Sequence, residues 1–308
     1  MLNPDRKYFE SLSEKTNFQI DILEKVNRLA VLLGMIYEND FLKNGLVLKG
    51  GTAINFIYFK MPRLSVDIDF NFTSDDSKEG MLESRKEIDR IIMKIFSITG
   101  YEVEKVQPYA LLQYNLKYRN TAGNIDRIKV EINFIERIPV FEIVEREISV
   151  FDNQLKVRTY VIEELFATKL RALLTRMASR DLFDVYNLLN SGLEYDERML
   201  KKCFIFYFCL ADDFRIINAK AISEIDPNEI KKFLLPLLEK GRRVKLDTVV
   251  GTVQELTLRM LSLNKNERIF IDQFYGQKIA NLDILFEDLK YNSKLKNHPM
   301  IKWRLKNM

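Results

Sequence analysis

Residues Leu46–Phe72 read LVLKGGTAINFIYFKMPRLSVDIDFNF, and this stretch decides the fold. It opens with a short apolar run that ends in two neighbouring glycines, Gly50 and Gly51. It closes with a run in which apolar and polar residues alternate, as they do along a half-buried strand. Asp67 and Asp69 are two residues apart in that run, so they share one face of the predicted strand. The predicted order is therefore strand, glycine turn, short helix and a strand that carries two carboxylates.

These residue types suit the binding of a metal and a phosphate. Two aspartates on one strand face, with Cα atoms about 6.5–7 Å apart, can bind one or two Mg²⁺ ions. Gly50 and Gly51 let a phosphate approach the backbone, while Thr52 adds a hydroxyl and can cap the short helix. Each feature alone has an ordinary reading, because solvated carboxylates on a strand and tight Gly-Gly-Thr turns are common. Their combination in this order is much more specific.

The rest of the first half predicts further helices and strands. Helical spacing of apolar residues predicts helices over residues 18–37 and 78–98. The segments 111–119 and 127–137 both alternate and flank a turn-like NTAGN, which predicts a β-hairpin. Glu131 lies on the polar face of the second hairpin strand. It could be a third metal ligand if that strand lies beside the one that carries the two aspartates.

From about residue 159 the pattern becomes helical and stays so. We therefore predict an α+β fold, with a small mixed-sheet domain over residues 1–155 and a mostly helical domain over residues 156–308. In the first helix of the second domain, Lys169 lies within the apolar stripe. An unpaired buried ammonium is costly, so Lys169 either extends to water or reaches phosphates. Asp181 and Asp184 follow on the next helix, after a break near residues 178–180.

Composition and charge limit the function classes. The chain has 308 residues, 47% of them hydrophobic, with two cysteines and one histidine, so a usual structural zinc site is excluded. Cys203 and Cys209 are expected to be buried free thiols. Residues 1–200 carry a net charge of −3 and residues 201–308 a net charge of +7. A basic second part suits a polyanion, although ordinary solvated helix faces explain it equally well. The polar N-terminus and the lack of a ~20-residue apolar run predict a cytoplasmic protein without a membrane segment.

Two motifs together resemble a known family. KGGTA followed by R-x-S-x-D-I-D-F, and ATKLRALL followed by RDLFDVY, look like the AbiEii/MenT family of nucleotidyltransferase toxins. That family has a nucleotidyltransferase fold of the polymerase-β type. The resemblance covers roughly residues 40–190, about half of the chain.

The resemblance implies roles for particular residues. Asp67 and Asp69 would bind Mg²⁺, with two ions possible, and Glu131 is the weakest assignment as a third ligand. Lys169 would contact the nucleoside triphosphate, and Asp184 matches an acid that the family needs for activity. Asp181 would support the structure with Arg180. The remaining implied nucleotide-binding residues are Gly50, Gly51 and Thr52 in the phosphate turn, and Arg63 and Ser65 along the pocket.

The implied activity is Mg²⁺-dependent transfer of a nucleoside monophosphate from a nucleoside triphosphate (NTP) to an acceptor. In the MenT branch the acceptor is the 3′ end of tRNA, and its extension blocks translation; the family also implies an antitoxin partner. Transfer to a protein or small molecule, or nucleotide binding without catalysis, stays open. The basic segments 231–245 and 297–308 suit an RNA partner. Trp303 could stack on a base, although packing of the C-terminal helix is the commoner role.

Overall fold

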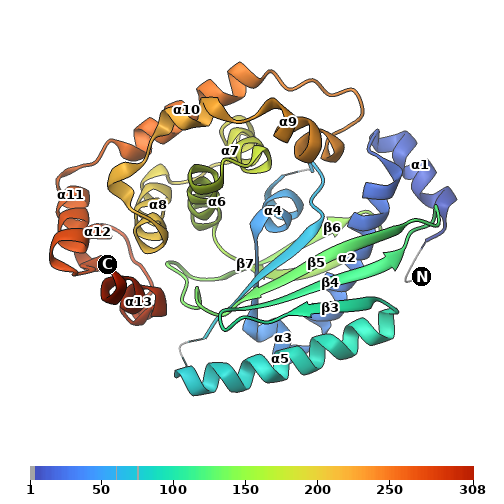
Figure 1. Ribbon diagram of the computed structural model, residues 1–308, viewed down its shortest axis with the longest axis horizontal. Helices are drawn as coiled ribbons and strands as arrows, with labels where there is room; N and C mark the ends of the chain where they lie inside the picture. Colours follow the sequence, from blue (N-terminus) through green and yellow to red (C-terminus); the bar gives the residue numbers. More distant parts are fainter. Residues whose placement is uncertain (1–3, 60, 75) are drawn as a thin grey trace. The chain divides into compact units, whose positions relative to one another are not determined.

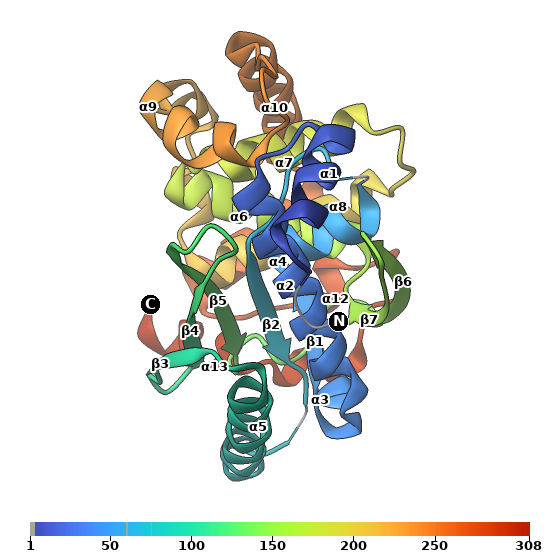
Figure 2. The same cartoon turned by 90° about the vertical axis from the view of Figure 1, so that its right-hand side faces the viewer.

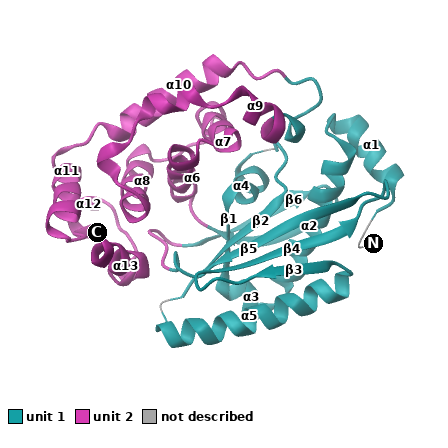
Figure 3. Cartoon of the chain, viewed as in Figure 1, with its two compact units in different colours: residues 1–137, 143–159, 235–242 teal, residues 138–142, 160–234, 243–308 magenta. Residues whose placement is uncertain are grey.

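The chain divides into two compact units, which Figure 3 shows in different colours. The computed structural model describes residues 4–59, 61–74 and 76–308. Unit 1 consists of residues 1–137, 143–159 and 235–242, and unit 2 of residues 138–142, 160–234 and 243–308. Each unit is described by itself below.

Unit 1 is built on one mixed sheet of seven strands (Figures 1 and 2). The strand order is β3-β4-β5-β2-β1-β7-β6. The pairs β2–β5 and β1–β7 are parallel and the others antiparallel. A mixed sheet with helices confirms the predicted α+β fold. The strands are β1 (Leu46–Lys49), β2 (Asp67–Phe72), β3 (Glu102–Val106), β4 (Leu111–Arg119), β5 (Ile125–Asn133), β6 (Val144–Val150) and β7 (Asn153–Thr159).

The predicted hairpin is confirmed as β4 and β5, and β5 also pairs with β2. The strand with the two aspartates is shorter than its alternation suggests, because it begins at Asp67 and not at Leu64. The backbone N–H of Leu64 donates to the carbonyl of Leu237 at 2.8 Å, so this residue is held outside the sheet ladder. Residues 235–242 thus return to unit 1 and fix the approach to β2.

One face of the sheet is apolar and is covered by helices. The predicted helices are present as α2 (Ile20–Glu38) and α5 (Lys78–Thr99), and Figure 1 shows α5 running along the sheet. Phe96 of α5 packs edge-on against Tyr114 of β4, with ring centroids 5.3 Å apart. Each large apolar side chain buried in this way contributes roughly 1.5–3 kcal/mol. On the opposite face, Asp67 and Asp69 of β2 and Lys129, Glu131 and Asn133 of β5 are polar and partly buried. The other helices of unit 1 are α1 (Arg6–Thr16), α3 (Asp40–Gly45) and α4 (Gly50–Ala53), which continues into a π-helical turn at Ile54–Tyr58.

Unit 2 is helical. Its first two helices confirm the predicted helix–break–helix: α6 ends at Arg176, and Met177 takes a left-handed conformation with φ 49° before α7. The buried Glu164 of α6 accepts the backbone N–H groups of Val140 and Phe141 at 2.8 and 3.0 Å, which holds residues 138–142 in unit 2. The helices are α6 (Ile162–Arg176), α7 (Ser179–Asn190), α8 (Glu197–Ala211), α9 (Pro227–Glu229), α10 (Leu246–Leu261), α11 (Lys265–Asp272), α12 (Leu282–Leu285) and α13 (Pro299–Asn307).

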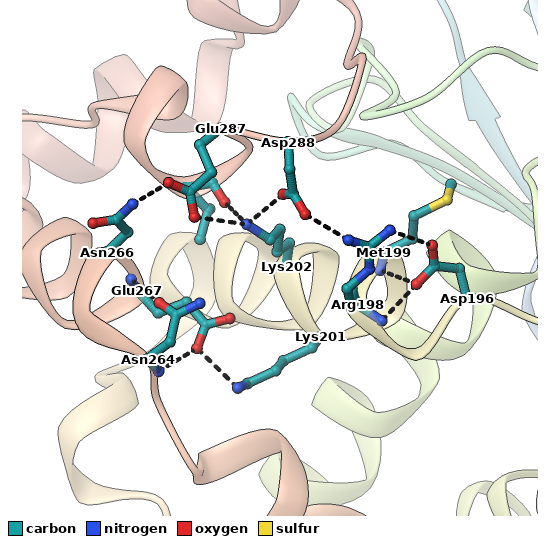
Figure 4. A network of polar contacts seen from close by, with 11 residues as sticks. Asp196, Arg198, Met199, Lys201, Lys202, Asn264, Asn266, Glu267, Glu287 and Asp288 are labelled. Atoms are coloured by element: carbon teal, nitrogen blue, oxygen red, sulfur yellow. Dashed lines mark hydrogen bonds and ion pairs between the residues drawn. The ribbon is translucent and has the colours of Figure 1, made fainter.

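Helix α8 organises unit 2 through the half-buried Lys201 and the buried Lys202, as Figure 4 shows. Lys202 donates to the carbonyl of Leu285 at 2.7 Å and lies 2.9 Å from Asp288. Lys201 lies 2.8 Å from Glu267, which forms the capping box of α11 with Asn264. The lysines of α8 therefore stabilise the unit and are not free to bind a ligand. Cys203 and Cys209 on the same helix are buried free thiols, as predicted.

None of the helices in the described ranges combines the length and the apolar character that a membrane span requires.

Candidate active site

The glycine turn lies directly against the aspartate strand. Gly50 has a left-handed φ of +72°, and a side-chain carbon there would come within 3.0 Å of the Asp69 carboxylate. A side-chain carbon on Gly51 would lie 2.6 Å from the buried guanidinium of Arg63. Both positions therefore require glycine for a packing reason, and Gly50 also for a backbone reason. The glycine turn and the strand that carries the two aspartates, which were predicted separately, meet at Gly50 and Asp69.

The prediction that Thr52 caps a helix is wrong, and its place in the phosphate turn stays a prediction. The helix begins at Gly50, so Thr52 lies inside it and does not cap it. The Thr52 side chain is fully buried; its hydroxyl donates to the carbonyl of Asp67 and lies 2.9 Å from the Ser65 hydroxyl. These bonds tie α4 to the first residue of β2. Thr52 and Ser65 thus fix the position of Asp67.

The sheet places Glu131 beside the aspartates. In the parallel pair of β2 and β5, Asp67 is in register with Lys129 and Asp69 with Glu131. The condition for Glu131 as a third carboxylate, that its strand adjoin β2, is therefore met. In this structure the Glu131 carboxylate is engaged by Lys129, whose ammonium nitrogen lies 3.1 Å away.

Lys129 is the residue of this site that the sequence analysis missed. Burial by itself lowers the pKa of Lys129, but the charges of Asp67, Glu131 and Asp69 outweigh burial and raise it above its ordinary value. The ammonium therefore stays charged in the field of all three carboxylates. A usable signal was its position two residues before Glu131, which puts both side chains on the same strand face.

The donor set fits a hard cation. Mg²⁺ takes oxygen ligands and commonly uses one or two carboxylates, with waters and substrate phosphates completing its shell. Asp67 and Asp69 supply two such ligands on one strand face. Within the described part of the chain, no group of three or more His, Cys, Asp or Glu side chains is arranged to hold a metal. The role of Glu131 as a third ligand stays a prediction.

Unit 2 carries the second group of predicted residues. The Lys169 ammonium lies 2.8 Å from Asp181 and 3.2 Å from Asp184, with the lysine side chain 8% exposed. Arg176 contacts the other oxygen of Asp181 at 2.6 Å. Lys169 therefore does not extend to water, since its charge is matched inside the protein. The sequence analysis had assigned Arg180, and not Lys169 or Arg176, as the partner of Asp181.

The charges of this cluster keep Asp181 ionised. Burial by itself would raise the pKa of the Asp181 carboxyl, but the charge of Lys169, and the hydrogen bond and charge of Arg176, hold it well below its ordinary range. Pairing with cations is how buried carboxylates are normally accommodated.

Comparison with known proteins settles the family. The sequence profile of the AbiEii nucleotidyl transferase toxins of type IV toxin–antitoxin systems matches residues 32–257. The chain belongs to this family. It is accordingly a nucleotidyltransferase, and membership of a toxin–antitoxin family implies an antitoxin partner. A search of curated proteins found no match.

A solved structure agrees with the AbiEii assignment at the level of the fold. MenT4, a nucleotidyltransferase toxin from Mycobacterium tuberculosis H37Rv, superposes with a TM-score of 0.61 at 15% sequence identity. The match covers 94% of this chain and 100% of MenT4. The similarity therefore extends over nearly the whole AbiEii chain, beyond the residues that the family profile matches.

The contact between the glycine turn and Asp69 gives a first prediction for this AbiEii toxin. We expect Gly50→Ala to lower nucleotidyl transfer at least tenfold, because the new methyl group must displace the Asp69 carboxylate. Gly100→Ala is the matched control: Gly100 has a nearly identical φ of +75°, but nothing lies within 4 Å of a side-chain carbon there. Both variants should lose about 1–2 kcal/mol of stability from the left-handed backbone. Steady-state transfer kinetics and urea unfolding of both variants separate the clash from the strain. Equal activity of the two variants would contradict the prediction.

Proposed function

We propose that this AbiEii toxin transfers a nucleoside monophosphate from an NTP to the 3′ end of tRNA, requires Mg²⁺, acts in the cytoplasm and thereby blocks translation. The observation that carries the proposal is the contact between Gly50 and Asp69. The Asp69 carboxylate occupies the position that a side chain on Gly50 would take, so the backbone of the glycine turn lies directly beside a partly exposed carboxylate, as the joint binding of a triphosphate and its cation requires. The basic character of residues 201–308 supports a polyanionic acceptor.

The proposed reaction is a single displacement at phosphorus. A hydroxyl oxygen of the acceptor forms a bond to the α-phosphorus, the bond to the bridging oxygen breaks, pyrophosphate leaves, and the hydroxyl proton passes to solvent. Asp67 and Asp69 would hold Mg²⁺, which supplies Lewis-acid neutralisation of phosphate charge. Catalysis of this kind depends chiefly on positioning and on fixed charges.

The surrounding residues of unit 1 fix these positions. Thr52 and Ser65 hold Asp67 in place, and the buried Arg63 packs against Gly51, so the turn and the strand keep one relative arrangement. Lys129 places one positive charge close to the three carboxylates Asp67, Asp69 and Glu131. A permanent cation there lowers the repulsion between the carboxylates when no metal is bound.

Lys169 and Asp184 belong to the same proposal as residues needed for transfer. Lys169 has three donor hydrogens and two carboxylate partners, so it can offer a hydrogen bond to a triphosphate oxygen without abandoning Asp181. Asp184 would then keep the Lys169 ammonium oriented. The ion pairs of Lys169 with Asp181 and Asp184 support both the phosphate-binding role of Lys169 and the orienting role of Asp184.

The acceptor is tested with chemically blocked tRNA. Periodate destroys the 3′-terminal diol of tRNA and leaves the rest of the molecule unchanged. If the 3′ end accepts the nucleotide, intact tRNA should take label from one of the four α-³²P-NTPs, and oxidised tRNA should take none. Equal labelling of both would move the acceptor to an internal position. Label recovered in a protein or a small molecule, and not in RNA, would show that the acceptor is not tRNA.

A further inference from the structure

Trp303 is exposed, contrary to the expectation that it packs the C-terminal helix. Its exposed fraction is 56%, which is large for a tryptophan. Helix α13 is anchored by other residues: Ile301 is buried, and the ring nitrogen Nδ1 of the buried His298 accepts the backbone N–H of Met300 at 3.1 Å. Trp303 is therefore not needed to hold the helix in unit 2, and its exposure needs another explanation.

Two exposed lysines lie close to Trp303 on α13. Lys306 follows Trp303 by three positions and Lys302 by four, so Lys306 is a neighbour of both of these side chains on the helix surface. Both lysines are exposed, and neither has an ionic partner among the described residues. We call Lys302, Trp303 and Lys306 the α13 face. Arg304 is not part of it, because its guanidinium donates to the carbonyl of Cys209 at 3.3 Å.

The sequence around the α13 face is uniformly basic. Residues 289–308 contain six Lys or Arg residues and no Asp or Glu. Asp288, the last acid before them, is itself paired with Lys202 and Arg198. Lys296 is excluded from the face, since it pairs with Asp283 at 2.8 Å. The charges of Lys302 and Lys306 are thus left without local compensation.

We propose that the α13 face binds single-stranded RNA, with a base stacked on Trp303 and backbone phosphates at Lys302 and Lys306. Unpaired cations beside an exposed aromatic ring form the combination by which proteins hold single strands without sequence preference. This inference rests on the proposed RNA acceptor and names a surface that would hold it. A purely apolar protein-docking face would not place two unpaired ammonium groups next to its one aromatic residue.

The chain offers a direct spectroscopic test, because Trp303 is its only tryptophan. We would titrate the full-length protein with a short single-stranded RNA and with tRNA while recording tryptophan emission. Stacking should quench the emission, and the quenching should weaken as salt is raised. Trp303→Ala, followed by fluorescence anisotropy of labelled RNA, should weaken binding roughly 5- to 150-fold.

The two lysines are tested by charge removal. Lys302→Gln with Lys306→Gln should reduce the slope of log K against log salt by about 1.4, since each single-strand phosphate contact contributes about 0.7. The matched control is Lys86→Gln with Lys94→Gln on α5, which removes two exposed lysines that also lack an ionic partner among the described residues. The control slope should stay at the wild-type value.

Three results would overturn the inference. RNA could leave tryptophan emission unchanged while transfer to tRNA proceeds, in which case the α13 face fails and the proposed function stands. Anionic lipid vesicles could quench the emission when RNA does not, which would make the face a membrane contact. The double variant of Lys86 and Lys94 could reduce the slope of log K against log salt as much as the double variant of Lys302 and Lys306, which would show that RNA binding is not confined to the α13 face. Failure of the proposed function itself is separate, because it appears as an absence of label on tRNA.

Discussion

Replacing Asp69 with asparagine should abolish nucleotidyl transfer and leave the fold intact. Asparagine has the shape of aspartate, so it fits beside Gly50 and keeps the pairing of β2 with β5. It lacks the negative charge that a hard cation requires. A metal contributes several kcal/mol to transition-state stabilisation in such reactions, so we expect a loss of about 10³-fold or more in kcat/KM.

The measurement is kcat/KM for transfer at saturating Mg²⁺, with thermal unfolding recorded on the same samples. Asp21→Asn is the matched control, because Asp21 is half exposed and its one ionic contact among the described residues is with Arg6 at 3.9 Å. The control should keep wild-type activity, and both variants should melt within a few degrees of wild type. If Asp69→Asn retained a tenth or more of the activity, the Asp69 carboxylate would not be a catalytic group.

Replacing Lys169 with alanine should lower the free energy of unfolding by about 3–5 kcal/mol, because it leaves buried carboxylates without their shared cation. Asp181 and Asp184 are 1% and 0% exposed, so water cannot replace the ammonium without a rearrangement. Urea unfolding at pH 7 measures the effect. Adding Asp184→Asn to Lys169→Ala should recover part of the loss, since it removes one of the two buried carboxylates that lose the Lys169 ammonium. No destabilisation by Lys169→Ala would mean that the cluster is not what holds α6 to α7.

The loss of stability caused by Lys169→Ala should become smaller as the pH falls. The pKa of Asp181 is depressed in the folded protein, so its pairing contributes stability above the unfolded pKa of about 4, and that contribution is lost as the pH falls through the folded value. In Lys169→Ala the carboxylates can be neutralised by protonation. The stability gap between wild type and variant should therefore narrow below pH 4. Because Lys169→Ala is expected to be less stable, any loss of its transfer activity must be compared with its free energy of unfolding before the loss is assigned to catalysis.

Local periodicity explains how much of the site could be predicted. A strict alternation placed Asp67 and Asp69 on one strand face, and two adjacent glycines marked the turn. The partner of β2 could not be deduced in the same way, because strand pairing is a long-range contact that no local pattern encodes. The register of Asp69 with Glu131 therefore had to come from the structure.

The corrections have specific physical causes. Thr52 was expected to cap a helix, but the helix begins two residues earlier at Gly50, and the buried Thr52 hydroxyl donates to the carbonyl of Asp67. The hairpin of β6 and β7 was missed although its second strand alternates, because its many charged residues resemble a solvated loop. Trp303 was expected to pack because tryptophan usually does, and only the burial of Ile301 and His298 shows that α13 is anchored without it.

The central claim is that this protein transfers a nucleoside monophosphate, and the position of the label within the nucleotide tests it most directly. The wild-type protein and Asp69→Asn are incubated with tRNA, Mg²⁺ and the preferred NTP, labelled with ³²P at either the α- or the γ-phosphate. We predict that α-label enters tRNA with the wild type, that γ-label does not, and that Asp69→Asn transfers neither. Entry of γ-label would show phosphoryl transfer, and α-labelling that survives in Asp69→Asn would show that the aspartate strand is not the catalytic centre.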